Sequence, residues 1–318
     1  MESKEKPFVN LFHTIDYFYC YDVNTNSIIR INKETYHDIQ KCLRGENVDA
    51  LSINKLQGRG YLKPNDKNIK VQHSALSSIE QYMNGNLRQL ILQVTQNCNL
   101  RCKYCVYSGS YINRTHTNKR MTFETAKKAV DFYFSHSTNK DVGIISFYGG
   151  EPLLEFELIQ EIVAYCSKLY RGKNVRFNMT TNATLLTDAI VEYLYENDFN
   201  LTISLDGPQN VHDQSRVFAD NHSGTFEKIM ENLDEIEQKY PAYMNNISFN
   251  AVLDTSNDFQ CSSNFFTYDF IKDAVVTVTT LNENGNKNEI KYNEAFDINY
   301  RYELFKCYLK CLGRLDET

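Results

Sequence analysis

The stretch Leu92-Gln-Val-Thr-Gln-Asn-Cys98-Asn-Leu-Arg-Cys102-Lys-Tyr-Cys105 decides how this sequence is interpreted. It continues a strand candidate, Leu90–Thr95, and then places three cysteines on a short loop at C-x-x-x-C-x-x-C spacing. In a β/α barrel, the loops that follow the strands form the carboxyl-terminal mouth, where active sites lie. We therefore expect Cys98, Cys102 and Cys105 to share one site.

Three thiolates at this spacing suit an iron–sulfur cluster. They can bind three irons of a four-iron cluster and leave the fourth iron open to a small molecule. The flanking cations Arg101 and Lys103 are expected to favour the thiolate form. A zinc site is one alternative, but tetrahedral zinc prefers four ligands and the other six cysteines form no second C-x-x-C pair. Unligated core cysteines are the other, but three within eight positions of one loop are improbable by chance.

Composition and charge exclude several classes of function. The 318 residues include 34 basic and 40 acidic side chains, and the net charge of −6 argues against a general nucleic-acid binder. The first residues, Met1–Pro7, contain no apolar signal core, and no apolar run approaches membrane-spanning length. We expect a cytoplasmic protein with neither nucleic acid nor membrane as partner, whose crowded cysteines bind metal before they form disulfides.

From residue 87 onward, strand candidates alternate with helix candidates. The strand candidates are Leu90–Thr95, Gly143–Tyr148, Val175–Thr180, Leu201–Leu205, Ile247–Leu253 and Ala274–Thr280. The helix candidates are Thr122–Ser135, Leu153–Tyr170, Thr187–Glu196, Thr225–Tyr240 and Asp258–Asp269. Repeated β-α-β order implies parallel strands with helical crossovers. We expect an α/β fold, with a partial (β/α)6 barrel over residues 85–290 and an open doubly wound sheet as the alternative.

Residues 1–75 are expected to form a separate, small α+β module of winged-helix-like type. Its predicted elements are a hairpin of two strands, two helices and a closing strand, at Tyr17–Asp22, Ile28–Ile31, Lys33–Cys42, Val48–Gly58 and Gly60–Leu62. A polar stretch, Lys63–Lys70, indicates a linker after the module.

The segment Phe147-Tyr-Gly149-Gly150-Glu151-Pro152 follows the second barrel strand. Its glycines let the backbone approach a ligand closely, and Glu151 supplies a carboxylate that can face an ammonium group. Pro152 suits the first turn of the next helix. A plain strand–turn–helix connection is the alternative, and the cysteine loop one unit earlier favours the functional interpretation.

Two further strand ends carry polar side chains. Thr180-Thr-Asn182-Ala183 follows the third strand, and the simpler role of Asn182 is to cap the following helix. Ser204-Leu-Asp-Gly-Pro ends the fourth strand, and His212-Asp-Gln-Ser-Arg216 follows it. The guanidinium of Arg216 fits a carboxylate in two-point geometry, against the alternative of a surface ion pair. A hydrogen bond within a turn is the simpler role of His212.

The C-x-x-x-C-x-aromatic-C loop after the first barrel strand resembles the signature of the radical S-adenosylmethionine (SAM) superfamily. This resemblance implies that Cys98, Cys102 and Cys105 bind a [4Fe–4S] cluster, whose remaining iron is chelated by the amino and carboxylate groups of SAM. It places Tyr104 against the adenine of SAM.

The other motifs resemble the same superfamily in order and spacing. Gly149, Gly150 and Glu151 correspond to the motif that holds the SAM amino group. The turn at Asn182, where Ala183 stands in place of the usual glycine, corresponds to a turn that reaches the ribose. By the same resemblance the strand end at Ser204 faces the site, and Arg216 pairs with the SAM carboxylate.

The wording of the cysteine loop and of S-L-D-G-P…H-D…R is most similar to the SPASM-type subgroup, which modifies peptides and proteins. The resemblance implies a precursor peptide with a leader segment, an electron donor such as flavodoxin or ferredoxin, and a 5′-deoxyadenosyl radical that takes hydrogen from the peptide. A thioether crosslink is the expected product, with formylglycine formation, or peptide binding without turnover, as alternatives. The N-terminal module looks like a leader-recognition element, with an ordinary packing domain as alternative.

One departure concerns the end of the chain. Resembling maturases continue into a cysteine-rich domain with auxiliary clusters, whereas this sequence stops at Thr318. Residues 291–318 are expected to hold a last helix, at about Tyr292–Leu312, as the truncated start of a following region. Cys307 and Cys311 lie at i and i+4 on that helix and are expected to be half-buried residues, since two thiols cannot house a cluster.

Overall fold

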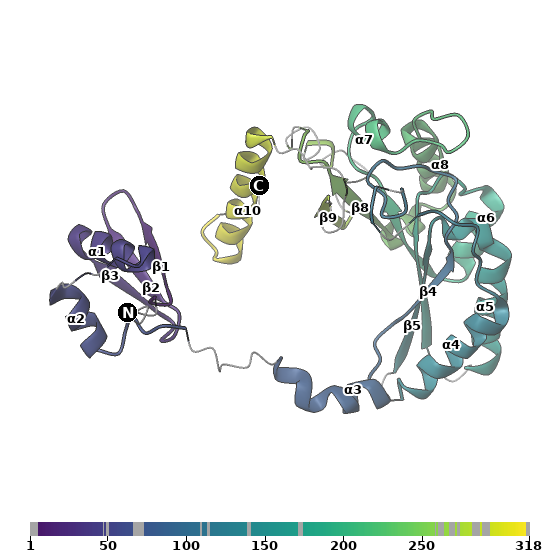
Figure 1. Cartoon of the computed structure of the whole chain (residues 1–318). Helices are drawn as coiled ribbons and strands as arrows, with labels where there is room; N and C mark the ends of the chain where they lie inside the picture. The colour runs from purple at the N-terminus through teal and green to yellow at the C-terminus, as the bar shows by residue number, and fades with distance from the viewer. Residues whose placement is uncertain are drawn as a thin grey trace. The chain divides into compact units, whose positions relative to one another are not determined.

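The computed structural model describes residues 6–46, 48, 51–65, 73–108, 110–112, 115–138, 141–170, 174–257, 259, 264–266, 271, 274–281, 287 and 293–315. The chain divides into two units, Met1–Leu76 and Ser77–Thr318 (Figure 1). In the described part of the chain, no helix combines the length and the apolar character that crossing a membrane requires.

The N-terminal unit is a three-stranded antiparallel sheet followed by two helices. Its elements are β1 (Val9–His13), β2 (Phe18–Asp22), β3 (Ser27–Ile31), α1 (Lys33–Arg44) and α2 (Leu51–Gly58), with sheet order β1-β2-β3. Helix α1 begins where the side chain of Asn32 accepts a hydrogen bond from the Thr35 amide, and ends at Gly45, whose φ is 87°. A small core of Cys20, Ile39, Ile53, Leu56 and Leu62 holds the helices on the sheet.

The predicted hairpin is confirmed by β2 and β3, but the predicted strand at Gly60–Leu62 is wrong. The third strand is β1, which precedes the hairpin in the chain. Leu62 has a φ of 58°, in the left-handed region that an extended strand cannot use. Its amide donates to the buried carboxylate of Asp22 at 2.7 Å, so a side chain replaces the ladder partner that the prediction assumed.

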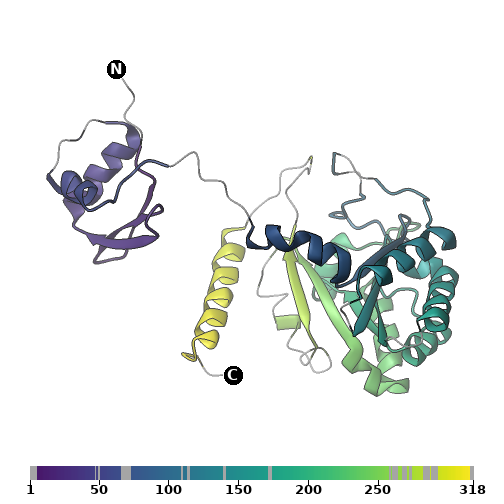
Figure 2. The ribbon, with the colours of Figure 1, turned by 90° about the horizontal axis from the view of Figure 1, so that it is seen from below.

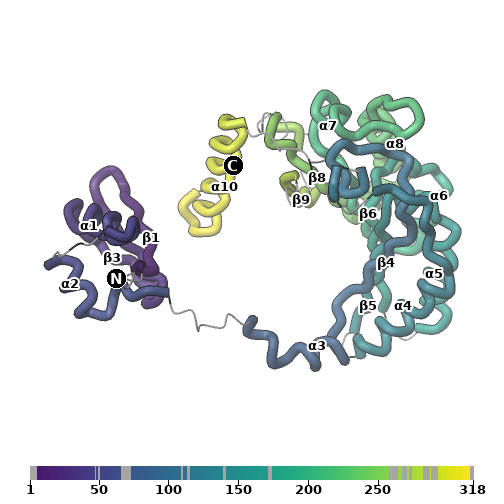
Figure 3. Tube along the Cα trace, in the orientation of Figure 1, coloured from purple at the N-terminus to yellow at the C-terminus, as the bar shows by residue number. Residues whose placement is uncertain are grey.

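The second unit is built on six parallel strands. These are β4 (Leu90–Thr95), β5 (Val142–Gly149), β6 (Asn174–Thr181), β7 (Phe199–Ser204), β8 (Ile247–Leu253) and β9 (Val276–Thr280). Neighbouring strands pair in chain order from β4 to β9, and Figure 3 traces the chain along them. A doubly wound sheet reverses its strand order at a switch point, so that alternative is wrong and the partial β/α barrel is confirmed.

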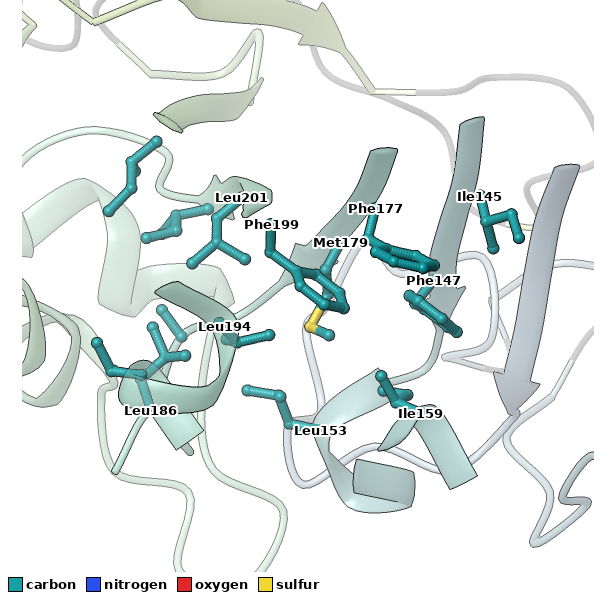
Figure 4. Packing of buried hydrophobic residues seen from close by; sticks show 14 of the residues in the cluster. Ile145, Phe147, Leu153, Ile159, Phe177, Met179, Leu186, Leu194, Phe199 and Leu201 are labelled. Atoms are coloured by element: carbon teal, nitrogen blue, oxygen red, sulfur yellow. The ribbon is translucent and has the colours of Figure 1, made fainter. Parts of the chain in front are cut away.

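Helices cover one face of this sheet. The crossover elements are α4 (Phe123–Ser135), η2 (Pro152–Glu155), α5 (Phe156–Leu169), α6 (Asp188–Glu196), α7 (Gln209–Ser215), α8 (Phe226–Lys239) and η3 (Pro241–Asn246). Figures 1 and 2 both show α4, α5 and α6 outside the strands. Between these helices and the sheet lies the main core, where Phe147, Phe177 and Phe199 stack across β5, β6 and β7 (Figure 4). The opposite face of the sheet stays available for a site, because successive side chains of a strand point to opposite faces.

The last helix is confirmed as α10 (Glu294–Cys311), but Cys307 and Cys311 are exposed, not half-buried. The predicted helix Asp258–Asp269 falls mostly outside the described residues. Three short helices, η1 (Ser74–Ser78), α3 (Ile79–Gly85) and α7, were not predicted.

Candidate active site

The cysteine loop, Asn97–Cys105, is held by backbone hydrogen bonds to the last residue of α7 and to the segment that follows this helix. The amide of Arg101 donates to the carbonyl oxygen of Val217 at 2.8 Å, and the amide of Lys103 to that of Ser215 at 3.0 Å. The carbonyl of Asn99 accepts from the Ala219 amide at 2.8 Å. These bonds form a short antiparallel ladder, so two segments more than 100 residues apart in sequence fix each other's path.

The three thiols that the sequence singled out come together. Cys98, Cys102 and Cys105 are free and line one pocket of about 270 Å³ at the carboxyl ends of the strands. The same pocket is lined by six further residues predicted for the site: Tyr104, Gly149, Gly150, Asn182, Ser204 and Arg216. Glu151 alone among the predicted residues does not line it.

Burial governs the thiol chemistry in this structure. Removal from water raises the pKa of the Cys98 thiol to about 12 and that of Cys102 to about 11, and it also raises the pKa of Cys105. Arg101 favours the thiolate of Cys105 as expected, but burial outweighs it in the net direction of the pKa. Arg101 lowers the pKa of Cys105 only as a minor effect, and its guanidinium donates to the carbonyl oxygens of Cys98 and Leu100 at 2.6 and 2.7 Å. Iron binding must then release thiol protons.

Asp206 connects the elements around the pocket. Its side chain is 3% exposed, and its carboxylate accepts hydrogen bonds from Nε and Nη2 of Arg216 at 2.8 and 3.1 Å. It also accepts from the hydroxyl of Tyr104 and, at 2.9 Å, from the amide of Val252 on β8. Burial alone would raise the pKa of Asp206, but attraction to the Arg216 guanidinium lowers it below its ordinary value. The surface ion pair considered for Arg216 is wrong, because this ion pair is buried.

Arg216 and Tyr104 thus reach the pocket as a pair. The guanidinium carbon of Arg216 lies 5.4 Å from the centre of the Tyr104 ring, within cation–π distance. Asp206 does not line the pocket and acts from behind both of them. No role was predicted for this aspartate of the S-L-D-G-P motif, although its carboxylate stands ten residues before the arginine.

His212 has a structural position. It is fully buried; its Nδ1 accepts from the Asp206 amide at 3.3 Å, and its Nε2 lies 3.0 Å from the Thr225 hydroxyl. That hydroxyl donates to the Arg216 carbonyl, so the His212 Nε2–H donates to Thr225. Burial lowers the pKa of His212 to about 4, which keeps the ring neutral. His212 therefore connects Asp206, before α7, with Thr225, after it, through hydrogen bonds to both ring nitrogens.

Glu151 differs from its expected role in contacting a ligand. The side chain is buried, and its carboxylate accepts from the amides of Leu153 and Asn182 at 3.1 and 2.8 Å and from the Thr181 hydroxyl at 2.7 Å. Burial raises the pKa of Glu151 to about 7. In this structure the carboxylate joins the ends of β5 and β6 behind the wall of the pocket.

Gly149 and Gly150 let the β5 end lie against the cysteine loop. A Cβ on Gly149 would stand 2.5 Å from the carbonyl oxygen of Thr95, and one on Gly150 would stand 2.0 Å from that of Asn97. The Gly150 amide donates to Thr95 at 2.9 Å. The glycines are therefore required for this backbone contact, and their own backbone forms part of the pocket wall.

The turn after β6 accommodates an alanine where glycine is usual. Ala183 is buried with a φ of 62°, and its carbonyl accepts a hydrogen bond from the buried Asn232 amide group at 2.8 Å. The Asn182 side chain donates to Asn99 of the cysteine loop at 2.9 Å and accepts from the Thr184 amide at 3.0 Å. The alternative role of capping α6 is wrong, since that helix begins after Thr187.

Two of the pocket residues that the sequence did not reveal carry an unpartnered polar atom. His116 Nε2 and Asn250 Oδ1 are buried without a hydrogen-bond partner among the described residues, and both side chains line the pocket. Asn250 is paired with Ser204 in the sheet, so strand alternation placed it on the open face. His116 lies in the segment before α4, and nothing in its local sequence marks it.

The fold and the site define a β/α-barrel protein with a thiol-lined pocket at the carboxyl ends of its strands. Residues 92–258, which are 167 of the 318 residues, match the family model described as the radical SAM superfamily. The chain belongs to the radical SAM superfamily.

Several known proteins are similar to part of the chain. An uncharacterized protein of Methanocaldococcus jannaschii is 38% identical over 176 residues, which cover 55% of each chain. A cysteine-type anaerobic sulfatase-maturating enzyme of Clostridium novyi is 33% identical over 151 residues, covering 46% of this chain and 40% of that enzyme. Native anSMEcpe, solved with bound AdoMet and Kp18Cys peptide, shares the fold with a TM-score of 0.56 at 21% identity, covering 71% of this chain and 62% of its own. The chain spans about half the length of these curated relatives.

The pocket fits the cofactors of the superfamily, a [4Fe–4S] cluster and SAM. Among the described residues, no group of His, Cys, Asp and Glu side chains is arranged to hold a single metal ion. A four-iron cluster makes a different demand, because it takes one thiolate on each of three irons and its thiols need not converge on one point. The two unpartnered acceptors, His116 Nε2 and Asn250 Oδ1, leave hydrogen bonds for a ligand to complete.

Proposed function

We propose that this chain binds a [4Fe–4S] cluster through Cys98, Cys102 and Cys105 and cleaves SAM reductively beside it. The observation that carries the proposal is the gathering of three free thiols in one pocket with Arg216 and the Gly149–Gly150 backbone. When bound, the cluster would supply one electron to the SAM sulfonium, whose C5′–S bond would break to give methionine and a 5′-deoxyadenosyl radical.

The chain's own residues are proposed to bind and orient SAM. Arg216 binds the SAM carboxylate, using the side of its guanidinium that Asp206 leaves available. Tyr104 provides a ring for the adenine, and the backbone of Gly149 and Gly150 faces the amino group in place of the buried Glu151. Asn182 supplies a polar group for the ribose. Ser204, at the end of β7, faces the bound SAM.

SAM cleavage is tested with anaerobically reconstituted protein and a strong reductant. The expected result is release of 5′-deoxyadenosine by the wild type and loss of both cluster absorbance and release in Cys102→Ala. Cys307→Ala is the matched control, because its thiol is exposed on α10 and lies outside the pocket. A wild-type protein that holds the cluster yet releases no 5′-deoxyadenosine would reject the proposal.

We infer further that the hydrogen donor is a carbon of a ribosomally made precursor peptide. The similarity to a sulfatase-maturating enzyme supports a polypeptide substrate, as does the polar, open face of the sheet. A thioether crosslink is the proposed product, and formylglycine is the alternative. Mass spectrometry of the treated peptide separates them, because thioether closure removes two hydrogens and keeps the sulfur, whereas formylglycine from cysteine loses it.

The N-terminal unit is proposed to bind the leader of that peptide by strand addition. Strand β3 is the favoured edge, because the residues just before β1 already pair with another segment: Pro7 bridges to Pro64, and the Phe8 amide donates to the Lys63 carbonyl at 2.9 Å. Addition of a leader peptide to the full chain should slow hydrogen exchange at amides of Ser27–Ile31. Leader binding without SAM turnover would favour the peptide-binding alternative, and unchanged exchange at β3 would reject this edge.

A further inference from the structure

The cysteine loop is held to the barrel by buried side chains as well as by backbone: Asn182 bonds to Asn99 at one end of the loop, and Asp206 bonds to Tyr104 at the other. The ladder between Arg101 or Lys103 and the segment after α7 consists of single N–H to carbonyl bonds. Asp206 adds an ionic contact, because Tyr104 stands between two of the thiols in sequence and its hydroxyl donates to the same carboxylate oxygen as Arg216 Nε. The Val252 amide anchors the other oxygen to β8. One carboxylate therefore joins the cysteine loop, the residue that follows α7 and strand β8.

We propose that Asp206 is a positioning residue for the cysteine loop: by holding Tyr104 and Arg216 it fixes the path of the loop before any cluster binds. The proposal deepens the proposed function and rests on it for the identity of the bound cluster. Asp206 has no contact with the pocket, so it acts through the two residues that do line it.

The physical reason lies in burial. A carboxylate that is 3% exposed is stable as an ion only while Arg216 and its donors stay in place, so any outward movement of the loop breaks charge-assisted hydrogen bonds. The ladder alone lacks this penalty, since water can replace a lost amide bond at a pocket rim. The three thiols are thereby presented without metal, in a loop that does not have to fold around the iron.

The first test uses cluster-loaded protein and the rate of iron release to a chelator. Asp206→Asn keeps the size of the side chain and removes its charge, and release is expected to accelerate about tenfold. Asp213→Asn is the matched control: it also removes a carboxylate, one that accepts the Thr225 and Phe226 amides at 2.8 and 3.0 Å and leaves the loop untouched. The variant side chain keeps an amide oxygen that can accept from these two amides, so the stability of the control should stay close to that of wild type, with release within about twofold.

The second test needs no cluster. In the metal-free protein, hydrogen exchange at the Arg101 and Lys103 amides is expected to be about tenfold faster in Asp206→Asn, with exchange in β5 and β6 unchanged. A general loss of stability would accelerate both regions together. If Asp206→Asn fails to fold, Tyr104→Phe removes only the hydroxyl donor and should accelerate loop exchange about threefold.

The two tests separate the possible failures. A wild-type chain that holds no cluster would refute the proposed function, while amide exchange would still decide the role of Asp206. Loop exchange equal in wild type, Asp206→Asn and Tyr104→Phe would overturn the positioning role. Equal acceleration in the loop and in the sheet would overturn it as well.

Discussion

The two faces of the parallel sheet carry different parts of the molecule's chemistry. On β6 and β7, Phe177 pairs with Phe199 toward the helices, while the next pair, Asn178 and Asn200, points to the open face. The phenylalanines stack with ring centres 5.4 Å apart, and the asparagine side chains share a hydrogen bond of 3.1 Å in an exposed position. The helix-covered face therefore carries the packing that stabilises the fold, and the open face can be polar.

The largest effect should follow from Phe199→Ala. The ring is fully buried and stacks on Phe147 and Phe177, so its loss leaves a cavity as well as exposed contacts. The free energy of unfolding, measured by circular dichroism in urea, should fall by about 3–5 kcal/mol. A loss below about 1 kcal/mol would show that the helix-covered face does not dominate stability.

The next effect is a dependence on pH at the loop end of the barrel. The folded pKa of His212 is lowered from 6.5 to about 4, so the folded state binds fewer protons than the unfolded state between these values. Its contribution is fully present above pH 6.5 and is lost as the pH falls toward 4. It amounts to about 3 kcal/mol.

The variant His212→Gln isolates this contribution. Glutamine keeps a polar side chain and cannot titrate, so the unfolding free energy of the variant should change less than that of wild type across the same pH window. Parallel pH profiles of the two proteins would contradict the assignment of the buried neutral ring.

A small effect on the free energy of unfolding is expected at Asn200, the residue after Phe199 on β7. Asn200→Ala removes a side chain on the open face and one exposed hydrogen bond to Asn178. The unfolding free energy should change by less than about 1 kcal/mol. Phe199→Ala and Asn200→Ala thus form a matched pair on one strand, and similar losses in both would break the contrast between the faces.

The smallest effect is expected at the turn after β6. Ala183→Gly relieves a left-handed φ of 62°, which favours the variant by about 1 kcal/mol. It also removes a buried methyl group and loosens the unfolded chain, which together oppose that gain by a similar amount. The melting temperature should therefore stay close to that of wild type. A large drop would show that the alanine methyl has a packing role which the turn geometry does not explain.

The sequence predicted the barrel well because its strands are short stretches in which apolar and polar residues alternate, separated by amphipathic helices. Each of the six strand predictions overlaps an observed strand, from Leu90–Thr95 to Val276–Thr280. The strand predicted at Gly60–Leu62 is wrong because local sequence does not reveal the tertiary hydrogen bond that the Leu62 amide donates to Asp22, forty residues away. The short helix α7 was missed, since its seven residues make too few turns to show a period.

The site was predicted through residues whose neighbours in the chain belong to motifs. Cys98 and Arg216 stand in such motifs, and both line the pocket. Asp206 bonds to Tyr104 and Val252 from distant segments, and spacing along the chain does not encode these contacts. His116 and Asn250 line the pocket without belonging to any motif. Glu151 shows the converse, because a motif residue turned out to hold the wall of the pocket from behind.

The most direct test of the central claim is the electron paramagnetic resonance spectrum of the anaerobically reconstituted, reduced protein, with and without SAM. We predict the signal of a reduced [4Fe–4S] cluster whose shape changes when SAM is added, because SAM binds the iron that the three thiolates leave open. Zinc or no iron at these cysteines, or a cluster signal that stays the same when SAM is added, would contradict the proposed cluster with one iron open to SAM.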